Sequence, residues 1–247
     1  MAAAQMPAIV IVPGSWHTPA HAEPLKQALN QQGYEAEAHQ LASTGLKDPR
    51  PTFADDVSTI YKAVTAKLDQ GYDVCLVLHS FAGVPGAEAV NRLTKEGRLE
   101  ATGSSAKLVR VIFIAAYVFP VGFIMDAKLM LGPENPRFSI DANEMNNMAD
   151  TRLVLFNDLT SDDEAQQWID KLEPAYYLGK GPVISSDDWR MAPITVVTTR
   201  QDLAIPPERQ EMVWQGFPLI WLDAGHTPYI SQPERVAEIV VAALSET

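Results

Sequence analysis

The chain has 247 residues, of which 47% are hydrophobic and 20% are charged, a composition typical of a globular protein that buries a large core. It carries 19 Lys and Arg against 31 Asp and Glu, and the resulting net charge of −12 repels phosphate backbones, so we expect no nucleic-acid partner. The single cysteine, Cys75, excludes an intrachain disulfide.

Apolar runs alternate with helical patterns from the start of the chain. The β-branched run Ala8–Val12, between two prolines, is typical of a strand buried on both faces. Thr52, with Asp55 three residues later, predicts the start of an amphipathic helix. We expect strands over residues 8–12, 35–41, 73–78, 108–115, 193–197 and 217–222, and helices over 20–32, 53–70, 84–95, 207–215 and from 233 onward. This alternation predicts an α/β fold with a mostly parallel sheet of about six strands, flanked by helices.

The alternation is interrupted over residues 121–191, after the fourth strand. We expect a helical cap there, inserted into a core made of residues 1–120 and 192–247. Ser161 and Glu164 form a capping-box pattern ahead of a helix that contains Trp168. The segment is rich in methionine and aromatic residues, which favours an apolar, adaptable pocket wall, although each of them could instead belong to the cap's own small core. The Met-containing stretch 141–150 is the candidate for a mobile part that gates entry.

Ser80 is the candidate nucleophile. It follows a predicted strand and precedes a predicted helix, within Leu78-His-Ser80-Phe-Ala82-Gly83. A sharp strand–turn–helix lifts a serine hydroxyl out of the sheet and directs the following N–H groups at a developing negative charge. The usual pattern is G-x-S-x-G, and this chain has Leu78 and Ala82 at the two glycine positions. An ordinary turn or N-cap serine is the alternative.

A serine nucleophile needs a base, and the base needs an orienting acid. His226 is the one histidine after Ser80, in a loop that follows the last predicted strand. Asp202 follows the preceding strand at its carboxyl end, where catalytic groups gather in open parallel sheets. Asp223 is the competing acid, but it lies only three residues before His226. The predicted triad is therefore Ser80, His226 and Asp202.

Backbone N–H groups must stabilise the oxyanion that forms when a carbonyl is attacked. The N–H of Phe81 is one candidate. The second is expected from the loop after the first strand, where Ser15 is the first choice and Trp16 the second. Gly14 would let this loop approach the substrate closely, and His17 would either bind substrate or pin the loop.

Four segments carry a resemblance to a known family: IVIVPGSWHTP, LVLHSFAGVPG, TTRQDLAIPPE and DAGHTPYISQPE. The chain resembles the α/β-hydrolase superfamily, in particular small members such as plant methylesterases, hydroxynitrile lyases and their microbial relatives. The cap segment LFNDLTSDDEAQQWIDKLEP looks similar to fungal and bacterial relatives. The resemblance implies the same nucleophile, acid and base. Many members have His-Gly where this chain has Pro13-Gly14.

The expected activity is hydrolysis of a carboxylic ester or lactone of a small to medium apolar or aromatic substrate, through an acyl-enzyme. A lyase or carbon–carbon bond-cleaving enzyme with the same triad is one alternative, and a receptor-like binding protein with slow turnover is another. The predicted substrate-contact residues are Gly14, His17, Met125, Met130, Phe156, Trp168, Tyr177 and Thr227.

No cofactor or metal is expected, because the pair His17 and His21 has no third ligand nearby. The run after Met6 is too short for a secretory signal, and no stretch reaches the ~18 apolar residues of a membrane span. We therefore expect a cytoplasmic monomer or homodimer whose partner is a small-molecule substrate, with no membrane partner.

Overall fold

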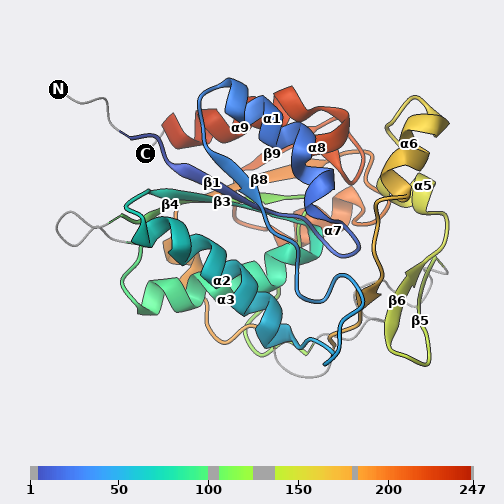
Figure 1. Cartoon of the computed structure of the whole chain (residues 1–247), viewed down its shortest axis with the longest axis horizontal. Helices are drawn as coiled ribbons and strands as arrows, with labels where there is room; N and C mark the ends of the chain where they lie inside the picture. The colour runs from blue at the N-terminus through green and yellow to red at the C-terminus, as the bar shows by residue number, and fades with distance from the viewer. Residues whose placement is uncertain (1–4, 100–105, 125–136, 180–182, 246–247) are drawn as a thin grey trace.

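A six-stranded parallel sheet runs through the centre of the computed structural model, which describes residues 5–99, 106–124, 137–179 and 183–245 (Figure 1). The strand order is β2-β1-β3-β4-β8-β9, and every neighbouring pair is parallel. The strands are β1 (Ala8–Val12), β2 (Ala36–Ala38), β3 (Val74–His79), β4 (Leu108–Ile114), β8 (Ile194–Thr199) and β9 (Leu219–Leu222). The sheet confirms the predicted α/β class and its strand count.

Helices cover both faces of the sheet. In Figure 1, α1 and α9 lie on one side and α2 and α3 lie on the other. The α-helices around the sheet are α1 (Glu23–Gln31), α2 (Phe53–Asp69), α3 (Gly83–Lys95), α7 (Pro207–Val213), α8 (Pro228–Ser231) and α9 (Pro233–Ser245). Short 3₁₀ helices are η1 (Pro19–Ala22), η2 (Ser80–Ala82) and η3 (Asp188–Met191). Among the helices of the described residues, none is both long enough and apolar enough to cross a lipid bilayer.

The elements form where local chemistry predicts them. All residues of β1, β3 and β4 are buried, as expected for continuous apolar runs between two helical layers. Thr52 and Asp55 form a capping box at the predicted start of α2. Gly33 and Gly71 end α1 and α2 with positive φ values of 88° and 91°, a conformation that glycine adopts at little cost. β2 is shorter than the predicted strand 35–41, because only residues 36–38 of that range pair with β1.

The insertion between β4 and β8 corrects one expectation, since its described part is not wholly helical. It contains α5 (Thr151–Leu155) and α6 (Asp162–Ile169), and Ser161 caps α6 by accepting a hydrogen bond from the Glu164 N–H at 3.2 Å, as predicted. It also contains a three-stranded antiparallel sheet of β5 (Phe138–Ile140), β6 (Met145–Met148) and β7 (Ala175–Tyr176). The Met-containing stretch 141–150, predicted as a gating segment, therefore includes one strand of a hairpin.

A buried carboxylate forms hydrogen bonds with the loop at Ser43, which in turn contacts the insertion. Asp56, on α2, accepts hydrogen bonds from the Ser43 backbone N–H at 2.8 Å and from the Ser43 hydroxyl at 2.7 Å. The Ser43 carbonyl in turn accepts the Tyr176 N–H of β7 at 2.8 Å. Burial raises the pKa of the Asp56 carboxyl from its ordinary 3.8 to about 6, against the opposing effect of the two Ser43 hydrogen bonds.

We expect this pKa to make stability depend on pH through Asp56. The raised pKa means that the folded state binds the Asp56 proton more tightly than the unfolded state does. This proton's contribution to the free energy of unfolding is therefore complete below pH 3.8 and is lost as the pH rises through about 6. Asp56→Asn removes this loss, so its free energy of unfolding relative to wild type should rise by up to about 3 kcal/mol between about pH 4 and pH 8. Urea unfolding at both pH values measures it, with the exposed Glu211→Gln as control. If the free-energy difference between Asp56→Asn and wild type were the same at both pH values, the raised pKa of Asp56 would be wrong.

Candidate active site

Ser80 lies in a strained turn between β3 and α3. Its φ is +53°, in the left-handed region that costs a residue with a side chain on the order of 1–3 kcal/mol. The Ser80 carbonyl accepts the N–H of Tyr117, in the segment after β4, at 3.2 Å. A neighbouring strand segment thus fixes the turn, and the hydroxyl is presented at the carboxyl end of the sheet.

Two glycines in the first turn of α3 allow close packing at this turn, which lacks the two usual glycines of G-x-S-x-G. A Cβ at Gly86 would lie 2.3 Å from the Leu78 Cδ1, so the large side chain of Leu78 occupies space that Gly86 leaves open. A Cβ at Gly83 would lie 2.3 Å from the Tyr117 carbonyl oxygen. The start of α3 can therefore approach β3 and β4 closely although Leu78 and Ala82 replace the usual glycines.

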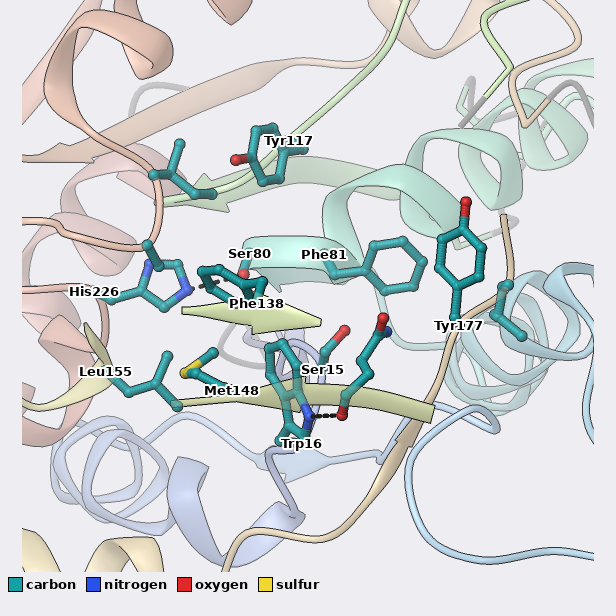
Figure 2. Close-up of a pocket in the computed structure, with 14 residues that line it drawn as sticks. Ser15, Trp16, Ser80, Phe81, Tyr117, Phe138, Met148, Leu155, Tyr177 and His226 are labelled. Atoms are coloured by element: carbon teal, nitrogen blue, oxygen red, sulfur yellow. Dashed lines mark hydrogen bonds between the residues drawn. The ribbon is translucent and has the colours of Figure 1, made fainter. Parts of the chain in front are cut away.

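The structure brings the three predicted triad side chains into one hydrogen-bonded chain. The Ser80 Oγ lies 2.9 Å from the His226 Nε2 (Figure 2), and the His226 Nδ1 lies 2.8 Å from the Asp202 Oδ2. A carboxylate only accepts, so the Nδ1–H of His226 donates to Asp202. The Nε2 then carries a lone pair that accepts the Ser80 hydroxyl proton. This is the arrangement that general-base activation of a serine requires.

Asp202 is held in place by the chain around it. Its side chain is fully buried, and its Oδ1 accepts the backbone N–H groups of Ala204 and Ile205, each at 2.8 Å. Its Oδ2 also accepts the Thr199 hydroxyl at 3.1 Å and the Gln210 amide at 3.3 Å. These donors satisfy a buried charge and fix the direction in which it faces His226.

The competing acid does not reach the imidazole. The side chain of Asp223 is 81% exposed and forms an ion pair with Arg200 at 3.2 Å. The separation of three residues from His226 therefore places this carboxylate on the surface instead of beside the ring.

His79, which the sequence analysis did not single out, connects the parts of the site. Its Nδ1 accepts the Gly14 backbone N–H at 3.2 Å and the Tyr229 hydroxyl at 3.0 Å. Its Nε2–H therefore donates to the His226 carbonyl at 2.9 Å. Burial, and then the neighbouring His226 and His17, lower the pKa of His79 well below its ordinary value, so the ring stays neutral and keeps this tautomer. Its place directly before Ser80 was the one sequence signal of this role.

We expect His79→Phe to lower kcat by roughly 10²-fold, because both loops that flank Ser80 lose a fixed anchor and small misplacements near the reacting atoms are costly. His79→Gln keeps an amide acceptor and an amide donor, so it should recover part of the loss. Steady-state kinetics on an aryl ester, the substrate class expected from the sequence, measures both variants, with thermal unfolding to confirm that they fold. Equal kcat in wild type and His79→Phe would contradict a positioning role.

The predicted oxyanion loop lies against Ser80. A Cβ at Gly14 would be 2.7 Å from the Ser80 Cβ and 3.2 Å from its Oγ, so only glycine fits there. Within the described chain, no backbone carbonyl accepts a hydrogen bond from the Ser15 N–H. Ser15, Trp16 and Phe81 all line the cavity into which Ser80 opens.

That cavity has about 670 Å³ of empty volume, counting its solvent-open part. The described residues that line it are Ser15, Trp16, Ser80, Phe81, Tyr117, Phe138, Asn146, Met148, Leu155, Tyr177, Leu178, Ala204, Ile205 and His226. Most are apolar or aromatic, and five of them, Phe138, Asn146, Met148, Tyr177 and Leu178, lie on or beside the strands of the insertion. Burial raises the pKa of Tyr117 to about 12, so this wall residue presents a neutral phenol.

Several predicted substrate-contact residues lie away from this cavity. Tyr177 lines it, but Phe156 packs behind it against His17, with ring centroids 6.1 Å apart. Trp168 lines a separate surface hollow beside Pro19. Thr227 is buried and donates its hydroxyl to the Leu155 carbonyl at 2.9 Å. Met125 and Met130 lie outside the described residues.

Gly14 and His17 help to fix the loop after β1 and are not among the residues that line the cavity. The Nδ1–H of His17 donates to the Ser15 carbonyl at 2.8 Å, the loop-pinning role that the sequence left open. Burial lowers its pKa well below the ordinary value, so the ring is neutral. In His21 the Nδ1 accepts the Thr18 N–H at 3.0 Å and the Nε2–H donates to the Trp168 carbonyl at 3.0 Å. Both nitrogens of His21 are therefore occupied, and this pair bridges the loop to the insertion.

Comparisons with known proteins agree with the fold. A family model described as "Alpha/beta hydrolase family" matches residues 9–239. The protein "Alpha/beta hydrolase nvfD" of Aspergillus novofumigatus (strain IBT 16806) is 31% identical over 255 residues, covering 97% of each chain. The solved structure of polyneuridine aldehyde esterase superposes with a TM-score of 0.75 at 19% identity, covering 96% of this chain and 99% of that one. A pyrethroid hydrolase from Sphingobium faniae JZ-2 does so with a TM-score of 0.73 at 15% identity, covering 98% of each. The chain belongs to the alpha/beta hydrolase family.

Proposed function

We propose that this protein is a serine hydrolase that cleaves a carboxylic ester or lactone of a small to medium apolar or aromatic substrate. The observation that carries the proposal is the hydrogen-bonded chain from Ser80 through His226 to Asp202, which opens into a mostly apolar cavity. A hydroxyl hydrogen-bonded to an oriented imidazole supports acyl transfer. The apolar lining favours an uncharged acyl or alcohol group beside it.

The proposed reaction proceeds in two halves. His226 accepts the Ser80 proton through Nε2 while the Ser80 Oγ attacks the carbonyl carbon, and the oxyanion is stabilised by the N–H groups of Phe81 and Ser15 or Trp16. His226 then gives the proton to the leaving alcohol, which leaves an acyl-Ser80. Water, deprotonated by His226, attacks the acyl carbon and releases the acid, and Ser80 regains its proton. Asp202 accepts the hydrogen bond from His226 Nδ1 in both halves and orients the imidazole.

The insertion supplies six of the described lining residues, and in this proposal it acts as the cap that selects the substrate. Names of similar proteins agree with a hydrolase, since the Aspergillus relative is named a hydrolase. The two solved structures named above are 19% and 15% identical, which supports the fold alone. The reaction is therefore argued from the site.

A substrate panel tests the proposal. Purified protein is assayed with p-nitrophenyl acetate, butanoate and benzoate and with an aryl-substituted lactone, beside Ser80→Ala prepared in the same way. The expected result is turnover of at least one ester class by wild type, which the variant lacks. Cleavage of a cyanohydrin without ester turnover would favour lyase chemistry. Tight binding of the panel without turnover would favour a receptor-like protein, and either outcome would overturn the proposal.

A further inference from the structure

A second hollow adjoins the cavity at Ser80 and shares part of its lining. The second hollow has about 1000 Å³ of empty volume, counting its solvent-open part. Four residues line both it and the cavity at Ser80: Trp16, Asn146, Met148 and Leu155. We call these four residues the partition. In Figure 2, Trp16, Met148 and Leu155 line one side of the view of the cavity, with Tyr117 at the opposite side. A ligand that passed the partition would extend from the nucleophile into the second hollow.

Trp16 is the largest member of the partition, and the insertion holds it in place. Its indole N–H donates to the Asn146 carbonyl of β6 at 3.1 Å, and its ring lies 6.0 Å from that of Phe138 on β5. Its carbonyl accepts the Glu173 N–H at 2.9 Å. Its backbone has φ +66°, an unusual conformation for a bulky residue that persists only where surrounding contacts fix it. The indole therefore depends on contacts with the insertion for its position.

The chemistry of the second hollow is apolar with an acidic edge. Its apolar lining, outside the partition, consists of Leu46, Met145, Ile169, Leu172 and Pro174. Asp141 and Glu173 add two carboxylates. Such a surface favours an uncharged hydrocarbon chain or ring and disfavours an anionic group.

We propose that the second hollow is a subsite for an uncharged apolar extension of the substrate, and that Trp16 is the specificity-determining residue that separates it from the candidate active site. The inference rests on the proposed esterase function, because it names the shape and chemistry of that function's substrate. The side chain of Trp16 sets how long an acyl chain the site accepts.

The test compares p-nitrophenyl butanoate with p-nitrophenyl decanoate. Trp16→Ala opens the partition, so the ratio of kcat/KM for decanoate to that for butanoate should rise about tenfold or more. Met148→Ala, at a half-buried position of the partition, should also raise the ratio of decanoate to butanoate kcat/KM. This second variant keeps the test decisive if Trp16→Ala folds poorly. An ester of the same length that ends in a carboxylate should gain less than decanoate, because Asp141 and Glu173 repel it.

Two further variants make the result specific. Trp221→Ala removes an indole from β9, outside both hollows, and should keep the wild-type ratio. Adding Leu172→Trp to Trp16→Ala refills the second hollow and should abolish the gain. A ratio that is unchanged in both Trp16→Ala and Met148→Ala would overturn the subsite, as would an equal rise in Trp221→Ala.

The subsite can fail independently of the esterase. If wild type cleaves no ester, calorimetric binding of the matching p-nitroanilides of butanoic and decanoic acid replaces turnover. Preferential binding of the longer amide by Trp16→Ala would then support the subsite while the esterase fails. If wild type cleaves butanoate normally and Trp16→Ala and Met148→Ala keep the wild-type preference between decanoate and butanoate, the subsite is overturned and the esterase is not.

Discussion

Ser80→Ala should lower kcat for a cleaved aryl ester by roughly 10⁴- to 10⁶-fold, the loss expected when the nucleophile of a coupled triad is removed. In the described structure the Ser80 hydroxyl is the one group within hydrogen-bond distance of the His226 Nε2, at 2.9 Å. In Ser80→Ala, Asp202 still orients the imidazole, but no hydroxyl is left to give it a proton. Residual turnover would come from the backbone donors of the oxyanion loop and from binding. Stopped or continuous absorbance assays on p-nitrophenyl esters measure the change.

Loss of activity must be separated from loss of fold. Ser80 has a φ of +53°, and alanine tolerates that conformation no better, so the strain stays and the thermal unfolding midpoint should change little. Ser58→Ala, on α2, is the matched control and should keep wild-type kcat. Activity within tenfold of wild type in folded Ser80→Ala would remove Ser80 from the chemistry.

Asp202→Asn should lower kcat by roughly 10⁴-fold, as loss of the correct imidazole tautomer does in other triads. The amide N–H of the new residue would donate to the His226 Nδ1, which now lies 2.8 Å from a carboxylate oxygen. The proton would then sit on Nε2, pointing at Ser80, and the ring could no longer act as a base. The amide oxygen can still accept the N–H groups of Ala204 and Ile205, so the loop should stay folded.

The matched control for this prediction is Asp223→Asn, at the exposed carboxylate paired with Arg200. It should keep wild-type kcat. If Asp223→Asn were as inactive as Asp202→Asn, or if Asp202→Asn kept more than a tenth of wild-type kcat, the assignment of the acid would be wrong.

Much of the fold and the triad geometry could be predicted because local sequence determines them. Continuous β-branched runs predicted strands buried on both faces, and the carboxyl ends of parallel strands meet at one edge of the sheet. Ser80, Asp202 and His226 follow β3, β8 and β9 there, so their order along the chain predicted their proximity in space. Capping residues such as Thr52 and Ser161 likewise act within one helical turn.

The wall of the cavity could not be predicted, because it depends on the direction in which each side chain of the insertion points. Phe156 and Trp168 were equally plausible contacts by residue type, yet Phe156 packs behind the cavity and Trp168 lines a different hollow. Phe138 and Met148 reach the cavity from an antiparallel hairpin that the apolar pattern did not indicate. Long-range strand pairing fixes those directions, and no short sequence window contains it.

The G-x-S-x-G pattern alone also does not show how the turn at Ser80 accommodates Leu78. Leu78 looked like a departure from the pattern, but its volume fits because Gly86 lies opposite it. The relation joins residues eight positions apart on different elements. His79 is similar, since its two ring nitrogens connect loops that begin near Gly14 and His226.

The most direct test of the central claim is covalent labelling of the nucleophile. The protein is treated with a fluorophosphonate probe and digested, and the modified residue is located by mass spectrometry. The structure predicts a single label on Ser80, which His226→Ala should slow severely because the hydroxyl loses its base. Absence of label on Ser80 in folded, ester-cleaving protein, or label on another serine that accounts for the activity, would contradict the account.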